Sequence, residues 1–170
     1  VYAGSALPFC NGGIVNELRW KNWDMAFSVV YQLGRHVINT LPFNNFRSGA
    51  NPFVMDIGGT KFWEKPGDDA EYPSWENALL DHFNAKCDRY VEKVNWLKMK
   101  TLTVGYTMPE RWMKKLGMKE LRVFASGENL FTWDNYSGLD PETVNITSGN
   151  DAGRNYPLAR KWTLGLTLKF

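Results

Sequence analysis

The sequence predicts an all-β protein: an antiparallel, up-and-down transmembrane β-barrel segment of about five strands, with a short helix in one turn. Three observations predict it. Several segments alternate apolar and polar residues with a period of two, and the connections between them alternate between short and long. The last strand ends on an aromatic residue, Phe170. Alternation places every second side chain on the same face, so each strand has one apolar and one polar face.

The composition argues against several other classes. The 170 residues are 15% aromatic and carry a net charge of only +2, with Lys and Arg scattered, so no nucleic-acid surface is expected. No apolar run is long enough for a transmembrane helix. Cys10, Cys87, His36 and His82 match no zinc spacing, and no catalytic set stands out. We therefore expect no metal, no cofactor and no enzyme activity.

The clearest strand lies near residues 160–170. Its alternate residues from the tryptophan onward are all large and apolar, namely Trp162, Leu164, Leu166, Leu168 and Phe170. The residues between them are polar or small. A tilted strand of about ten residues crosses an apolar band of roughly 25 Å. The pattern fits one strand of a membrane barrel.

A hairpin is predicted near the start of the chain, with strands near 13–20 and 23–34. Phe27 and Val29 share the apolar face of the second strand, and Val30 is an exception on its polar face. The intervening Lys21-Asn22 has the length of a tight hairpin turn, which makes the two strands antiparallel neighbours. Trp20 and Trp23 then flank the turn, where a membrane aromatic girdle belongs.

Two more strands are predicted near 93–106 and 120–133. Lys98 and Lys100 interrupt the alternation of the first, and Phe124 falls on the polar side of the second. Between the strands, Pro109 suits the first turn of a short helix and Gly117 suits its end.

The order of the connections favours a membrane barrel over a soluble fold. Long extracellular loops are expected near 35–92 and 134–159, and short periplasmic turns alternate with them. The alternative is a secreted, soluble β-sandwich that binds carbohydrate, in which the apolar faces would be buried against each other. Bacterial barrels begin at eight strands, so the remaining strands are expected from a longer polypeptide or from other chains.

Several segments resemble one family of transporters. They are the runs from Trp96 to Tyr106, Lys114 to Gly117, Leu121 to Phe124, Ser126 to Thr132 (Ser-Gly-Glu-Asn-Leu-Phe-Thr), Gly138 to Glu142 and Tyr156 to Phe170, with Gly12-Gly13 and the Lys-Asn-Trp-Asp hairpin. Together they are similar to the C-terminal part of the β-barrel of SusC/RagA-type TonB-dependent outer-membrane transporters. The resemblance covers most of the chain except roughly residues 44–88.

The resemblance implies a barrel of about 22 strands in the cell outer membrane of a Gram-negative bacterium, with the short helix in a periplasmic turn. It implies import of oligosaccharides or peptides. The implied partners are a SusD-type surface lipoprotein, outer-membrane lipid, the rest of the barrel, and the TonB complex. The TonB complex would act through an N-terminal part, plug included, that this sequence does not contain.

Two groups of residues are candidates for specific roles. Thr163, Gly165, Leu168 and Phe170 resemble the terminal signal read by the barrel-insertion machinery; the simpler reading is a final amphipathic strand. The loop aromatics could contact a ligand or the lid protein, or pack within their loops: Phe62, Trp63, Tyr72, Trp75 and Tyr136. Trp133 is expected to anchor the membrane boundary or to pack within the protein. Cys10 and Cys87 are both expected on the oxidising exterior, where a disulfide is permitted.

Overall fold

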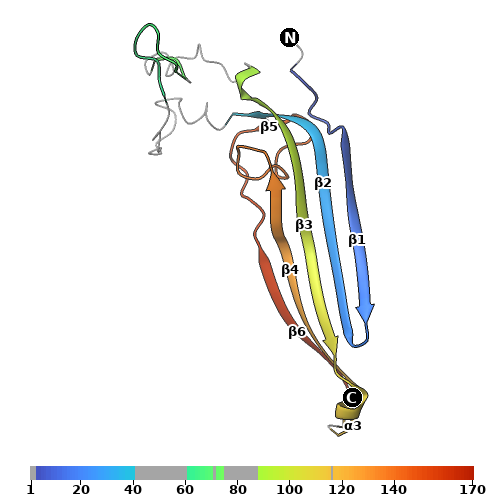
Figure 1. Ribbon diagram of the computed structural model, residues 1–170. Helices are drawn as coiled ribbons and strands as arrows, with labels where there is room; N and C mark the ends of the chain where they lie inside the picture. Colours follow the sequence, from blue (N-terminus) through green and yellow to red (C-terminus); the bar gives the residue numbers. More distant parts are fainter. Residues whose placement is uncertain (1–2, 41–60, 71, 75–87, 116) are drawn as a thin grey trace.

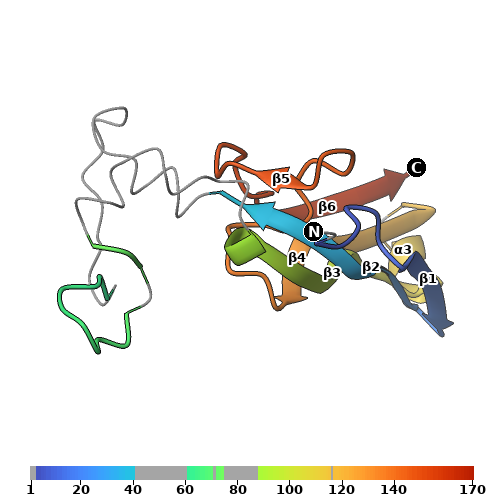
Figure 2. The same cartoon turned by 90° about the horizontal axis from the view of Figure 1, so that it is seen from above.

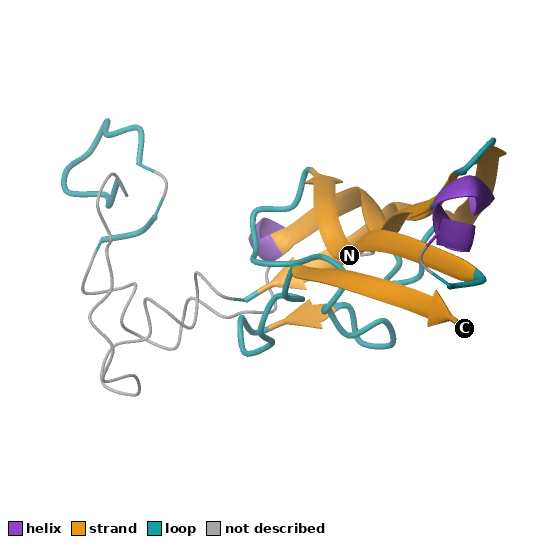
Figure 3. Cartoon of the chain, turned by 90° about the horizontal axis from the view of Figure 1, so that it is seen from below, coloured by secondary structure: helices purple, strands orange, loops and turns teal. Residues whose placement is uncertain are grey.

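The computed structural model describes residues 3–40, 61–70, 72–74, 88–115 and 117–170. Most of these residues belong to one six-stranded, mainly antiparallel sheet with little helix (Figures 1 and 3). The long strands are β1 (Cys10–Trp20), β2 (Trp23–Asn39), β3 (Val91–Thr107), β4 (Glu120–Asp134) and β6 (Lys161–Lys169). The short elements are η1 (Asp88–Tyr90), α3 (Glu110–Lys115) and β5 (Asn150–Asp151).

The long strands pair in chain order, β1-β2-β3-β4-β6, and every one of these pairs is antiparallel. Trp20 pairs with Trp23 across the turn at Lys21 and Asn22, and Lys21 adopts a left-handed conformation with φ 54°. The predicted up-and-down sheet is confirmed. β2 continues to Asn39, beyond the end expected near residue 34.

The register aligns the apolar faces of all five long strands into one continuous surface. Leu121 pairs with Leu168 and Val123 with Leu166, and the same matching runs across the other pairs. Leu164 is 83% exposed and Leu166 is 66% exposed. In the part of the chain that the structure describes, no second sheet covers this surface, so the soluble β-sandwich is not supported. The apolar face comprises Ile14, Leu18, Trp20, Trp23, Met25, Phe27, Val29, Tyr31, Leu33, Leu97, Met99, Leu102, Val104, Tyr106, Leu121, Val123, Ala125, Phe131, Trp133, Trp162, Leu164, Leu166 and Leu168.

Aromatic residues mark both ends of the apolar face. At the hairpin end, the Trp23 ring lies 4.8 Å from the Tyr106 ring, and Trp20 is 68% exposed. At the opposite end, Phe131 and Trp133 are stacked 5.8 Å apart. Such bands are typical of the two interfaces of a membrane-spanning barrel.

The opposite face of the sheet is polar and is crossed by side-chain hydrogen bonds. The hydroxyl of Ser28 lies 2.7 Å from that of Thr101. Near the hairpin end, the Arg122 guanidinium forms a two-bond ion pair with Asp24. These partners come from β2, β3 and β4, so they tie three strands together on the polar face.

Two irregularities change which residues face the polar side at the end remote from the hairpin. The β2–β3 register shifts between Gln32 and Arg35, where Gly34 has φ 71°. The β3–β4 register shifts between Met99 and Thr101. A bulge of this kind inserts an extra residue and reverses the alternation beyond it. As a result, Arg35 and Lys98 both lie on the polar face.

The connection from β4 to β6, residues 135–160, folds back over the polar face; we call it the strap. It crosses β3 and β2 and adds β5 in parallel to the far edge of β2, where Ile38 pairs with Asn150 (Figures 1 and 2). The amide of Ile38 donates to the carbonyl of Gly149 at 2.7 Å. The strap therefore covers one end of the polar face.

The short helix α3 lies between β3 and β4 at the hairpin end (Figure 3). It follows Pro109, buries Met113, and is succeeded by Gly117 with φ 69°. This matches the predicted helix in a turn. No helix among the described residues is both long and apolar enough to cross a bilayer.

Candidate functional site

The strap and the polar face of β2 and β3 enclose a small core. Val37 and Val94 are fully buried there, beside Trp96, Tyr136 and Val144. The Trp96 indole N–H donates to the Gln32 side-chain oxygen at 3.2 Å. A protein core on the polar face of the sheet means that the strap is packed against the sheet rather than projecting from it.

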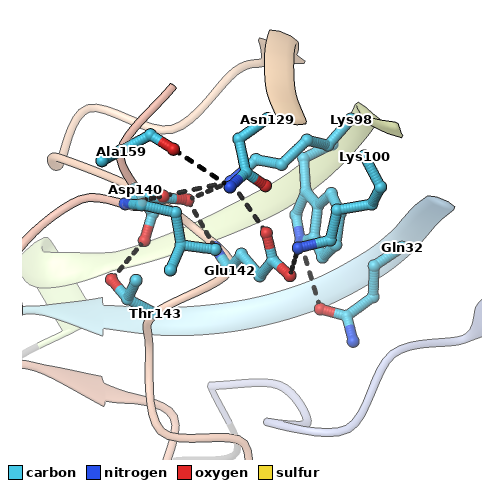
Figure 4. Close-up of polar contacts among 10 residues, drawn as sticks. Gln32, Lys98, Lys100, Asn129, Asp140, Glu142, Thr143 and Ala159 are labelled. Carbon is cyan, nitrogen blue, oxygen red and sulfur yellow. Dashed lines mark hydrogen bonds and ion pairs between the residues drawn. The ribbon is translucent and has the colours of Figure 1, made fainter. Parts of the chain in front are cut away.

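A buried lysine is the main charged link between the strap and β3 (Figure 4). Lys98 is 2% exposed, and its Nζ lies 3.0 Å from each Asp140 carboxylate oxygen and 2.8 Å from Glu142 Oε2. Glu142 also pairs with Lys100, which is partly exposed. The two lysines come from β3 and the two carboxylates from the strap, so charges of opposite sign hold the two elements together.

Asp140 is held by backbone groups as well as by Lys98. The amides of Glu142 and Leu158 donate to its two oxygens at 3.1 and 3.2 Å. Burial alone would raise the pKa of Asp140, but the hydrogen bonds from Lys98 and from these amides outweigh burial and hold the pKa below its ordinary value. Asp140 is therefore ionised when the strap is docked.

Arg35 fixes the far part of the strap. Its guanidinium donates to the carbonyl of Asn145 at 2.6 Å, to that of Val144 at 3.3 Å and to that of Ala6 at 3.0 Å. The side chain is 2% exposed. One buried guanidinium thus joins β2, the strap and the residues before β1.

Tyr136 and Asn39 complete the attachment of the strap to the sheet. The Tyr136 hydroxyl donates to Asp151 at 2.6 Å; burial and this hydrogen bond raise the pKa of Tyr136 well above its usual range. The Asn39 amide donates to Glu92 at 3.1 Å and to Ser137 at 2.9 Å. These contacts come from β2, β3 and both halves of the strap.

A hollow of about 290 Å³ opens beside the charged cluster. It lies between β3, β4 and the strap, and polar side chains predominate in its lining. Lys98 and Thr132 pair across β3 and β4 on the polar face, which places the hollow on that side of the sheet. A small ligand could enter this space next to the strap.

Comparison with known proteins assigns the chain to a family. It is 30% identical to TonB-dependent receptor P3 of Formosa agariphila over 176 residues, which is 98% of this chain. It is 28% identical to TonB-dependent receptor SusC of Bacteroides thetaiotaomicron over 161 residues, which is 93% of this chain. The chain belongs to the TonB-dependent receptor family. It spans 17% of the first relative and 15% of the second, and corresponds to the C-terminal part of the receptors.

Solved structures agree on the fold of this receptor segment. The RagAB peptide transporter matches with a TM-score of 0.74 at 22% identity, covering 98% of this chain and 18% of that chain. The RagAB peptide importer in its open-open state matches with a TM-score of 0.70 at 21% identity, again covering 98% and 18%. No protein-family model matches the sequence. The sheet thus matches a segment of a TonB-dependent receptor barrel. In such barrels the apolar face meets lipid and the polar face lines the lumen, and we name the two faces of this sheet the lipid face and the lumen face accordingly.

The receptor segment places the residues of the expected insertion signal on β6 and just after it. Thr163 and Gly165 lie on the lumen face, opposite Ser126 and Phe124, and Leu168 lies on the lipid face. A Cβ at Gly165 would lie 2.3 Å from the Phe124 ring, so the absence of a side chain there lets the ring cover β6. Gly165 therefore has a packing role in addition to any role in a signal. Phe170 is 75% exposed.

Of the aromatic residues expected in the loops, Phe62, Trp63 and Tyr72 lie before η1 in the chain, and Tyr136 lies in the strap. The Phe62 and Tyr72 rings lie 5.9 Å apart, and the Arg89 guanidinium lies 4.4 Å from the Tyr72 ring centre. Trp63 is 42% exposed. Tyr136 is only 8% exposed and its hydroxyl donates to Asp151, so in this structure it packs within the strap.

Trp75 and Cys87 lie outside the described residues, so neither ligand contact by Trp75 nor the Cys10–Cys87 pairing can be placed. Cys10 is half-buried on the lipid face of β1, opposite Leu33. Within the described ranges, no group of three or more His, Cys, Asp or Glu residues is arranged to hold a metal ion.

The sequence alone did not reveal the docking of the strap. Its signals were present, because Lys98 and Lys100 interrupt an apolar alternation and the strap contains Asp140 and Glu142. A buried cation needs a partner of opposite charge, so Asp140 and Glu142 were among the candidate partners. The sequence alone could not show which of the chain's carboxylates would pair with Lys98.

The pH dependence of the strap follows from Asp140. Because its pKa is lowered on folding, its contribution to stability is present above the unfolded pKa of about 4 and is lost as the pH falls through the folded value. We expect the thermal midpoint of the receptor to fall between pH 7 and pH 3, and Asp140→Asn to reduce that fall. An equal fall in the variant would contradict the assignment.

Proposed function

We propose that this chain forms part of a TonB-dependent importer in the outer membrane of a Gram-negative bacterium. The observation that supports the proposal is the continuous apolar face of five long strands, bordered by aromatic residues at both ends. A surface of this kind is stable in lipid and costly in water. The relatives are named as receptors, and the matched RagAB structures as a peptide importer or transporter.

In this proposal the chain supplies barrel wall and part of the entrance. The hairpin end and α3 face the periplasm, and the strap end faces the exterior. The strap narrows the lumen there because it is fastened to the inner wall by Lys98 and Arg35. The imported substrate is an oligosaccharide or a peptide, a SusD-type lipoprotein covers the entrance, and the TonB complex drives transport through a part of the protein outside this chain.

The proposal is tested by uptake in cells. Strains that carry or lack the full-length gene are given labelled oligopeptides and labelled oligosaccharides, with and without a functional TonB complex. We expect uptake of one class that requires both the gene and TonB. Uptake that is indifferent to the loss of either would contradict the proposal, and so would recovery of the full-length protein in the soluble fraction without detergent.

We also propose that Thr163, Gly165, Leu168 and Phe170 act together as the insertion signal of the barrel. Phe170 is exposed and follows the last paired residue of β6. Phe170→Ala is therefore expected to lower the amount of folded receptor in the outer membrane several-fold while leaving the unfolding temperature of the purified protein nearly unchanged. Heat-modifiable gel migration measures the first quantity and thermal unfolding the second. A large loss of thermal stability would instead assign Phe170 a packing role.

A further inference from the structure

The hollow beside the strap contains exposed side chains of opposite charge. Arg160 precedes β6 and Asp134 ends β4, and both line the hollow and are exposed. Arg160 makes no ion pair with any described residue, and Asp134 accepts a hydrogen bond from the amide of Tyr136 at 3.0 Å. A guanidinium has five N–H donors and a carboxylate about four acceptor positions, so both keep capacity for a ligand.

The other polar residues at the hollow are already engaged in contacts within the protein. Lys98 and Asp140 reach its wall, but each is buried and bonded to the other. Asn129 has a left-handed backbone, φ 52°, and its amide donates to the carbonyl of Ala159 at 3.1 Å. These residues shape the wall and hold the strap in place. Arg160, Asp134 and Thr132, which are all exposed residues, are left to face an incoming molecule.

The apolar part of the lining is aliphatic. Leu139, Leu158, Pro141 and Pro157 contribute it, and none of the described residues that line the hollow is aromatic. Ring faces are the surfaces on which flat apolar parts of a ligand, such as the C–H face of a sugar, stack best. Paired charges with hydrogen-bonding groups between aliphatic walls instead match a short peptide, which has charged termini and backbone amides.

We propose that this hollow is a peptide-binding subsite, in which Arg160 binds a carboxylate while Asp134 and Thr132 bind an ammonium or amide group. The inference rests on the proposed import function and selects peptides over oligosaccharides. It also gives the buried cluster a role in binding, because Lys98 and Asp140 hold the strap wall of the subsite.

The test uses the purified full-length receptor in detergent and measures binding calorimetrically. The probes are tetraalanine with free termini, the same peptide with an amidated C-terminus, and a neutral glucose oligosaccharide. Arg160→Gln is expected to weaken binding of free tetraalanine about tenfold or more, as expected when a charge-assisted hydrogen bond is lost. It should change binding of the amidated peptide little. Arg160→Lys should retain part of the affinity, and Asp134→Asn should weaken binding of both peptides.

Matched controls lie on the same strands outside the hollow. Lys161 and Glu128 form an ion pair at 3.6 Å next to Arg160 and Asn129, and neither lines the hollow. Lys161→Gln and Glu128→Gln should leave peptide binding unchanged. Equal binding of free tetraalanine by wild type and Arg160→Gln would overturn the inference, as would binding of none of the probes. Binding of the oligosaccharide alone would overturn it while leaving the importer proposal standing, whereas uptake independent of TonB would count against the importer itself.

Discussion

Lys98→Met is expected to destabilise the docked strap by about 3–5 kcal/mol, the cost of breaking a buried ion pair by removing one partner. The substitution keeps most of the side-chain volume but leaves Asp140, 6% exposed, without its cation. The buried carboxylate must then take up a proton, recruit water or leave the core with the strap. The measurement is limited proteolysis of the full-length receptor in detergent, which should cut within residues 135–160 far faster in the variant.

Lys100 provides the matched control on the same strand. It pairs with the same Glu142 but keeps 27% of its side chain exposed. Exposed ion pairs contribute little, commonly less than about 1 kcal/mol. Lys100→Met should therefore leave the strap almost as resistant to protease as the wild type. Equal sensitivity in both variants would show that burial of Lys98 does not set the strength of the attachment.

A double variant separates the loss of the pair from the loss of packing. Removing the charge of Asp140 as well, in Lys98→Met/Asp140→Asn, leaves no unpaired carboxylate at that position. We expect the double variant to recover part of the protease resistance lost in Lys98→Met, because much of the penalty is an uncompensated buried charge. If the double variant loses as much protease resistance as the two single variants lose together, the two residues act independently.

The faces of the strands could be predicted from sequence because each is set by nearest neighbours along the chain. Leu164 and Leu166 alternate with Thr163 and Gly165, and any regular strand places them on opposite faces. The hairpin at Lys21 was predictable for the same reason, since a two-residue connection allows few geometries. These features need no information about distant residues.

The strap could not be predicted because it depends on two bulges and on contacts between distant residues. The bulge at Gly34 turns Arg35 onto the polar face, and only then can it reach the carbonyl of Asn145, which is 110 residues away in sequence. The bulge near Lys100 turns Lys98 onto the polar face, where it reaches Asp140. Alternation read without bulges assigns both cations to the apolar face. The interruption at Lys98 was visible in the sequence, but its partner was not, and Arg35 was expected in the loop that begins near residue 35.

Leu164→Arg is expected to destabilise the barrel by about 2–4 kcal/mol, the cost reported for a cation on the lipid face near the middle of a membrane strand. Leu164 lies near the centre of β6, is 83% exposed and points to the lipid side. Thr163→Arg adds the same side chain one residue earlier, on the lumen face opposite Ser126, where water can reach the charge.

The two variants differ by one position along the chain and by the medium that surrounds the charge. Folding of the full-length receptor into lipid vesicles, followed by the shift in gel migration on boiling, measures the folded fraction of each. We expect Leu164→Arg to fold poorly and Thr163→Arg to fold nearly as well as the wild type. The reverse order would place the polar face in lipid. Equal tolerance of both variants would indicate that Leu164 lies in water, which is incompatible with a membrane-spanning β6.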